Sequence, residues 1–195
     1  MKTVCVFCGS RTGTRPSYLE AAKLMGKEVA RQGLGLVYGG GRVGLMGTLA
    51  DAALEEGGEV AGVIPKALVA RESAHTGLTE LHVVGSMHER KRLMAELSDG
   101  FVTLPGGFGT LEEFCEVLSW AQLGIHEKPF GLLDVEDFWK PLIALLDKAV
   151  AEGFVHPDHR SLVLTGQDPR TLLSLMEHYL PPETTGRWWG EEQDL

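Results

Sequence analysis

Short runs of β-branched and apolar residues alternate along this chain with longer segments whose apolar residues recur at helical spacing. The short runs have the length and composition of buried strands. Strands and helices that alternate in this way indicate an α/β fold with a mainly parallel, doubly wound sheet and helices on both faces, which is a Rossmann-like arrangement. Strands are expected at residues 4–7, 35–38, 59–64, 81–84, 101–104 and 131–133, with a further short one at 162–164; helices are expected at 17–32, 44–56, 87–97, 110–123, 138–152 and 169–180.

Chain length and the connections between elements bound the domain organisation. The chain has 195 residues, of which 44% are hydrophobic, and this is enough for one substantial core. The connections between the expected elements are too short to contain a second domain. We therefore expect one domain over residues 1–180. Residues 181–195 are rich in proline and acidic side chains and are expected to form a loosely packed tail or a subunit contact.

The net charge of −9 argues against a nucleic-acid polymer or a membrane surface as the partner, because both attract proteins with basic faces. An anionic ligand must then be held by a local group of residues. The N-terminal residues lead directly into a strand pattern, and the sequence contains no apolar run long enough to span a membrane. We therefore expect a cytoplasmic protein.

The three cysteines fit a reducing compartment. Cys5 and Cys8 have C-x-x-C spacing, but an odd separation in a strand places them on opposite faces. No second cysteine pair completes a zinc site, and the seven histidines include no H-E-x-x-H motif. The two thiols are expected in the core, and no metal site is expected.

The richest stretch for chemistry is residues 105–113, which reads as a glycine loop between a strand and a helix. Glycines let a ligand approach the backbone, and the first turn of a helix offers unpaired N–H groups, so this loop is suited to phosphate. The pattern also places Glu112 and Glu113 in that first turn, where they would repel a phosphate. Adjacent helical residues point about 100° apart, so only one of the two faces a small cleft squarely. The sequence does not choose between them.

Other polar segments follow neighbouring strands, and in a doubly wound sheet such segments share the carboxyl edge where ligands bind. They are Gly9-Ser10, the glycines 39–41 with Gly44, and residues 85–91. The glycines have a simpler explanation as a tight strand-to-helix turn, and they match neither the P-loop motif nor G-x-G-x-x-G. One cleft is expected to gather all of these segments.

Residues 86–91 combine a helix start with two cations. Ser86 and Glu89 have capping-box spacing, which explains Glu89 without catalysis. Arg90 and Lys91 then lie early in the helix, where the dipole disfavours cations. Two interpretations are open. The two cations form either a solvated basic pair or a clamp that faces Glu113 and holds the phosphate and the transition state.

Taken together, these motifs resemble the LOG (LONELY GUY) family. The resemblance runs in order from about residue 2 to residue 180 and includes two later segments, 120–126 and 128–129. It implies a phosphoribohydrolase that cleaves cytokinin riboside 5′-monophosphates to the free base and ribose 5-phosphate. It also implies a homodimer, for which Trp120 or the Trp188-Trp189 pair could supply buried aromatic area.

The family's M-x-x-R-K falls on Met87, Arg90 and Lys91, and its P-G-G-x-G-T-x-x-E falls on residues 105–113. The resemblance therefore makes Arg90 and Glu113 the catalytic pair. It implies Glu72 as a substrate contact, and it places Ser119 where relatives often have Thr and Phe108 where many have Tyr. The expected substrate-binding residues are Ser10, Gly40, Gly41, Gly44, Met46, Glu72, Met87, Lys91, Gly107, Phe108, Gly109, Thr110, Leu111, Glu112 and Ser119.

The residue types suit cleavage of a ribosyl C–N bond, because a carboxylate can stabilise an oxocarbenium-like centre or accept a proton from water. No metal or redox cofactor is expected. Two alternatives stay open: a general purine-nucleotide (AMP) nucleosidase that uses the same residues, and a non-catalytic nucleotide carrier of similar fold. A lysine decarboxylase, a label that some relatives carry, is rejected because the sequence shows no evident lysine for pyridoxal phosphate.

Overall fold

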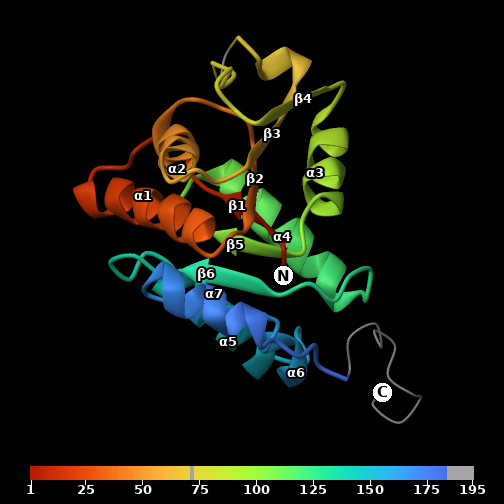
Figure 1. Ribbon diagram of the computed structural model, residues 1–195. Helices are drawn as coiled ribbons and strands as arrows, with labels where there is room; N and C mark the ends of the chain where they lie inside the picture. Colours follow the sequence, from red (N-terminus) through yellow and green to blue (C-terminus); the bar gives the residue numbers. More distant parts are fainter. Residues whose placement is uncertain (71–72, 184–195) are drawn as a thin grey trace.

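The computed structural model describes residues 1–70 and 73–183 (Figure 1). Its centre is a sheet of seven strands in the order β4-β3-β2-β1-β5-β6-β7. Every pair of neighbouring strands is parallel, which confirms the expected doubly wound fold. The strands are β1 (Thr3–Phe7), β2 (Gly35–Tyr38), β3 (Val60–Pro65), β4 (Glu80–Val84), β5 (Gly100–Thr103), β6 (Phe130–Leu133) and β7 (Val163–Gly166).

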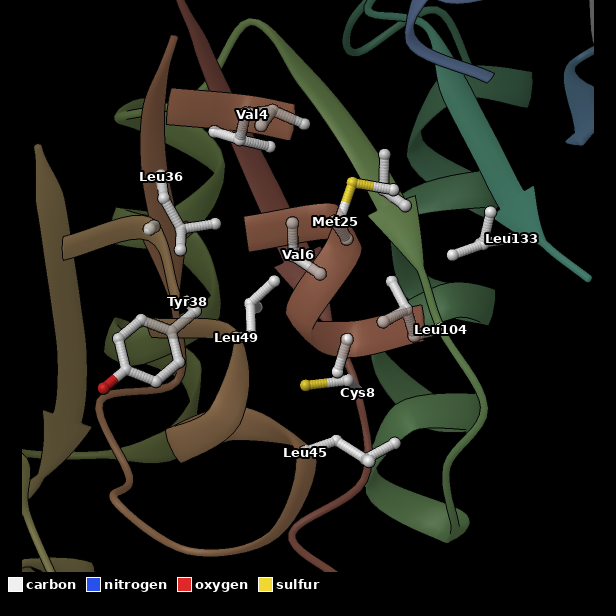
Figure 2. Packing of buried hydrophobic residues seen from close by; sticks show 14 of the residues in the cluster. Val4, Val6, Cys8, Met25, Leu36, Tyr38, Leu45, Leu49, Leu104 and Leu133 are labelled. Carbon is white, nitrogen blue, oxygen red and sulfur yellow. The ribbon is translucent and has the colours of Figure 1, made fainter. Parts of the chain in front are cut away.

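Helices cover both faces of this sheet, as the parallel strands require. Side chains of β1 alternate between two cores: Val4 and Val6 pack with α1, α2 and α7, whereas Cys5 and Phe7 pack with α3, α4 and α5. Figure 2 shows Val6, Met25 and Leu49 together in the first core. The helices are α1 (Pro16–Arg31), α2 (Gly44–Glu55), η1 (Lys66–Leu68), α3 (Met87–Glu96), α4 (Phe108–Gln122), α5 (Lys140–Ala151), α6 (Pro157–Arg160) and α7 (Pro169–Glu177).

The strand order reverses direction at β1, which pairs with β2 on one side and with β5 on the other. At such a switch point the loops that follow the two central strands diverge and leave a crevice at the carboxyl edge. Here these are the loop after Phe7 and the loop after Thr103. The backbone N–H of Gly9 donates to the carbonyl of Pro105 at 3.1 Å, which holds the two loops side by side.

Two helix starts and two short elements differ from the sequence expectations in an informative way. Helix α4 begins at Phe108 rather than Thr110, so Glu112 and Glu113 lie in its second turn and the expectation that they lie in the first turn was wrong. Helix α5 begins at Lys140 rather than 138, because Glu136 and Asp137 both adopt left-handed backbone angles. The four-residue helix α6 and the turn η1 are too short for a periodic pattern to reveal.

The C-terminal tail expected at 181–195 lies outside the described residues from 184 onward, and so does the Trp188-Trp189 pair. Trp120 is described and is partly buried against the second core.

Candidate active site

A cavity of about 540 Å³ opens at the switch point between β1 and β5. This volume lies within the range of small-molecule sites. Residues that follow six different strands reach it, because every strand of the parallel sheet ends at this edge. The lining residues are Cys8, Gly9, Ser10, Arg11, Thr12, Gly13, Tyr18, Leu45, Met46, Leu68, Met87, Arg90, Pro105, Gly106, Gly107, Phe108, Gly109, Thr110, Glu112, Glu113 and Phe138.

Arg90 reaches this cavity from the first turns of α3. The helix starts where expected, since Ser86 Oγ accepts the N–H of Glu89 at 3.1 Å and the Glu89 carboxylate accepts the N–H of Gly85 at 2.6 Å. The Arg90 side chain is buried, and its Nη2 donates to the carbonyl of Gly39 at 2.9 Å. Arg90 is therefore an oriented buried cation, and the alternative of a solvated basic pair does not describe it.

Glu113 of α4 lines the same cavity. Its negative charge acts on two thiols, that of Cys5 in β1 and that of Cys8 directly after β1. Burial above all, and then the negative charge of Glu113, raise the pKa of Cys8 well above its usual value. The same two causes raise the pKa of Cys5, and the positive charge of Arg90 opposes them. A carboxylate and a guanidinium thus share the protein-enclosed floor of the site, where electrostatic interactions are stronger than in water.

Glu112 has a different environment from Glu113. Its Oε1 accepts a hydrogen bond from Lys91 Nζ at 2.5 Å, and Glu116 Oε1 accepts another from the same ammonium at 3.0 Å. Burial alone would lower the pKa of Lys91, but the hydrogen bonds that Lys91 donates to Glu112 and Glu116 outweigh burial and raise that pKa. The two adjacent glutamates, between which the sequence did not choose, both line the cavity but differ in their partners. Glu112 pairs with Lys91, whereas the charge of Glu113 raises the pKa values of the two buried thiols.

The glycine loop of residues 105–109 forms the wall that suits a phosphate. The space around Gly107 and Gly109 is open, whereas a Cβ on Gly106 would lie 2.1 Å from Thr110 Oγ1. Gly107 is the N-cap of α4, so the amide groups of the first helical turn have no partners within the helix. Together with the helix dipole, these amides make an anion site.

The other glycine turn supports the site from behind rather than lining it. Gly40 and Gly44 have positive φ angles of 75° and 64°, and a Cβ on Gly44 would lie 2.3 Å from the carbonyl carbon of Ser10. Gly41 forms a bridge with Ala74, and the N–H of His75 donates to the carbonyl of Gly40 at 2.9 Å. The backbone explanation of these glycines is therefore sufficient for Gly40, Gly41 and Gly44.

Of the residues expected to bind substrate, the structure gathers Ser10, Met46, Met87, Gly107, Phe108, Gly109, Thr110 and Glu112 on the cavity. Lys91 and Leu111 are not among the described lining residues, and neither is Ser119, whose Oγ donates to the carbonyl of Cys115 at 2.7 Å. Glu72 lies outside the described residues.

Sequence reasoning missed several lining residues, among them Arg11, Thr12, Gly13, Tyr18, Leu68 and Phe138. Arg11 and Thr12 could have been found, because they directly follow Gly9-Ser10 on the same strand end. Tyr18 and Phe138 come from α1 and from the loop before α5, and their rings meet edge to face at 5.8 Å between centroids. No motif marks this pair, because only the folded chain brings it together.

Metal sites and membrane-spanning helices are absent from the part of the chain that the structure describes. Within residues 1–70 and 73–183, no group of three or more His, Cys, Asp or Glu side chains could hold a metal ion. No helix in the same ranges has the length and apolarity to cross a bilayer. No described residue that lines the cavity is a lysine, which a Schiff base to pyridoxal phosphate would require.

The fold is shared with solved structures of other activity. A molybdenum cofactor carrier protein from Chlamydomonas reinhardtii matches with a TM-score of 0.69 at 22% identity, over 90% of this chain and 96% of that one. A molybdenum cofactor binding protein from Rippkaea orientalis matches with a TM-score of 0.68 at 21% identity, over 91% and 96%. At this level of identity the likeness shows the fold alone.

Sequence relatives are much closer. The profile of a family described as "Possible lysine decarboxylase" matches residues 46–176. The probable cytokinin riboside 5′-monophosphate phosphoribohydrolase LOGL9 of Oryza sativa subsp. japonica is 52% identical, over 92% of this chain and 79% of that protein. The cytokinin riboside 5′-monophosphate phosphoribohydrolase of Rhodococcoides fascians is 55% identical, over 86% and 85%. LOG1 of Arabidopsis thaliana, of the same name, is 47% identical, over 92% and 84%. On these matches and the motifs that line its cavity, the chain belongs to the LOG family.

Proposed function

We propose that this protein hydrolyses the N-glycosidic bond of cytokinin riboside 5′-monophosphates and releases the free base and ribose 5-phosphate. The observation that carries the proposal is the placement of Arg90 and Glu113 on one cavity, next to the glycine loop that begins α4. A cation, a carboxylate and an anion site are the three groups that a nucleoside monophosphate cleavage needs.

The substrate phosphate binds at the first turn of α4, where the amides of Gly107 and Gly109 and the Thr110 side chain meet. This anchor places the ribose over the floor that holds Arg90 and Glu113. The base then lies toward the aromatic wall, which we define as Tyr18 and Phe138. An apolar N6 substituent gains free energy by contact with such a wall.

The reaction breaks the bond between ribose C1′ and the base nitrogen, and the bonding electrons leave with the base, which takes up a proton. The positive charge that develops on the ribose is stabilised by the Glu113 carboxylate, which also orients water toward C1′ and accepts its proton. Arg90 stays protonated throughout and acts by binding the ribose hydroxyls or the departing base. Hydrolysis transfers no electrons to a carrier, so the proposal calls for no redox cofactor.

We further propose a homodimer located in the cytoplasm. Phe108 at the cavity rim is 93% exposed, which is unusual for an aromatic ring and supports a second subunit near the site. The three cysteines are free thiols, as a reducing compartment favours.

The test compares initial rates of base release from N6-isopentenyladenosine 5′-monophosphate, AMP and unphosphorylated N6-isopentenyladenosine. We expect rapid release from the first, slower release from AMP, and none from the nucleoside, because the α4 site needs the phosphate. If AMP released its base as fast as N6-isopentenyladenosine 5′-monophosphate or faster, the protein would instead be a general purine-nucleotide nucleosidase. Binding without release of base from any of the three would identify a nucleotide carrier.

A further inference from the structure

Lys91 follows Arg90 on α3, and its ammonium lies against α4 rather than in the cavity. The Nζ contacts Glu112 Oε1 at 2.5 Å and Glu116 Oε1 at 3.0 Å, and the Lys91 side chain is only 11% exposed. We call these three residues the interhelix triad. Helices α3 and α4, which both contribute residues to the cavity, are thus joined by Lys91, the residue next to Arg90.

The pairing has a consistent register. On α3 the neighbours are Arg90 and Lys91, and on α4 they are Glu113 and Glu112. Arg90, Glu113 and Glu112 line the cavity, whereas Lys91 is not among the described lining residues and pairs with Glu112 from α3. A shift of α3 along α4 would break the triad and move Arg90 relative to Glu113 at the same time.

The triad also depends on its cation. Glu112 and Glu116 are one turn apart on α4, so their charges repel each other. Glu116 Oε2 is buried and has no hydrogen-bond partner among the described residues. Without the ammonium, α4 would carry an uncompensated carboxylate pair beside the place where a doubly charged phosphate binds.

We propose that Lys91 is a positioning residue that acts on the reaction through Glu112 and Glu116, by holding α3 and α4 in the register that sets Arg90 against Glu113, and that it is not a substrate ligand. The inference rests on the proposed function for its kinetic readout. Its structural content, the register of the two helices, is independent of that function.

The test is a mutant cycle with N6-isopentenyladenosine 5′-monophosphate. We expect Lys91→Met to lower kcat/KM by about 10²-fold, as expected when reacting groups are misplaced by about 1 Å. In a Glu112→Gln/Glu116→Gln background, where no charge is left to compensate, the same change should cost less than about 3-fold. Lys91→Arg, which keeps the cation, should restore most of the activity. An equal cost of Lys91→Met in both backgrounds would mean a direct substrate contact and would overturn the proposal.

Arg92→Met is the matched control, because Arg92 is the next cation of α3 but pairs with Glu96 of its own helix at 2.8 Å. It should leave kcat/KM unchanged. The NMR signal of the buried Arg90 Nε–H, recorded without substrate, separates this inference from the proposed function. We expect that signal to shift in Lys91→Met and to stay near its original position in Lys91→Arg, which keeps the cation. An unchanged signal in Lys91→Met would overturn the positioning role even if the wild-type protein released no base.

Discussion

Arg90 Nη2 donates a hydrogen bond to the carbonyl of Gly39 at 2.9 Å, although 51 residues separate the two along the chain. The glycine is needed for this contact, since a Cβ at position 39 would lie 2.0 Å from that nitrogen. The turn after β2 therefore acts as a template for the guanidinium. This role explains a glycine at position 39, which is not among the described residues that line the cavity.

Replacing Gly39 by alanine should displace the Arg90 guanidinium while leaving the sheet intact. We expect kcat to fall by about 10²-fold, the usual consequence of moving a reacting group by about 1 Å. Steady-state kinetics and a thermal melt of the Gly39→Ala variant test this. Alanine at Gly35 is the control, because Gly35, like Gly39, has no left-handed φ, and a Cβ there would come no closer than 3.4 Å to Thr3. Full activity in Gly39→Ala would show that the template is dispensable.

Glu113→Gln should lower kcat by about 10²-fold or more, because the amide neither stabilises a cationic ribose nor accepts a proton. The melting temperature should change little. Glu112→Gln should lower kcat by less than about 10-fold, because Glu116 still pairs with Lys91. The opposite order of the two losses would transfer the catalytic role to Glu112.

Phe138→Ala should change the choice of base. Removing one aromatic face costs about 1–3 kcal/mol of binding to an apolar substituent. We therefore expect kcat/KM for N6-isopentenyladenosine 5′-monophosphate to fall by 10-fold or more and that for AMP to fall much less. The ratio of the two kcat/KM values is the measurement.

Phe154→Ala is a matched control for the aromatic wall, since Phe154 is 83% exposed and does not line the cavity. It should leave the ratio unchanged. Equal losses for both nucleotides in Phe138→Ala would place the N6 substituent elsewhere in the cavity.

Acid stability should depend on Asp99. The backbone N–H groups of Lys2 and Thr3 donate to Asp99 Oδ2 at 2.6 and 3.0 Å, and these bonds hold the pKa of Asp99 below its usual value of 3.8. The stabilisation is therefore present above about pH 4 and is lost as the pH falls through the lowered pKa.

In the Asp99→Asn variant we expect a loss of about 1 kcal/mol or less at pH 7, because the group is partly exposed, and a shallower fall of stability with acid. Urea unfolding at pH 7 and at several values below pH 4 measures both. Parallel curves for the two proteins over the whole acid range would show that Asp99 does not contribute.

The sheet could be predicted from the sequence, because parallel strands are buried on both faces and therefore appear as short apolar runs. It also predicted that the loops after β1, β2, β4 and β5 meet at one edge, since that follows from topology. Element ends were less predictable. The start of α5 depends on Asp134, whose Oδ1 accepts the N–H of Trp139 at 2.8 Å, and on the left-handed residues before it.

The site residues also divide into those that the sequence predicts and those that only the folded chain brings together. Arg90 and Glu113 lie in motifs. Local pattern left Glu112 and Glu113 undecided, and the family resemblance selected Arg90 and Glu113 as the expected catalytic pair. The placement of Lys91 against Glu112 was not predictable, because it depends on the distance between α3 and α4, which are 21 residues apart at this contact. The aromatic wall is similar, since Tyr18 and Phe138 are distant in sequence and meet only through packing.

The most direct measurement of the central claim is the identity and ratio of the products that wild-type protein forms from N6-isopentenyladenosine 5′-monophosphate in buffer without inorganic phosphate. Chromatography with mass detection quantifies both halves of the molecule. We expect free N6-isopentenyladenine and ribose 5-phosphate in equal amounts, and almost none of either from Glu113→Gln. Release of AMP, which would mean loss of the side chain rather than of the sugar, or a nucleotide that stays intact at high protein concentration, would contradict this claim.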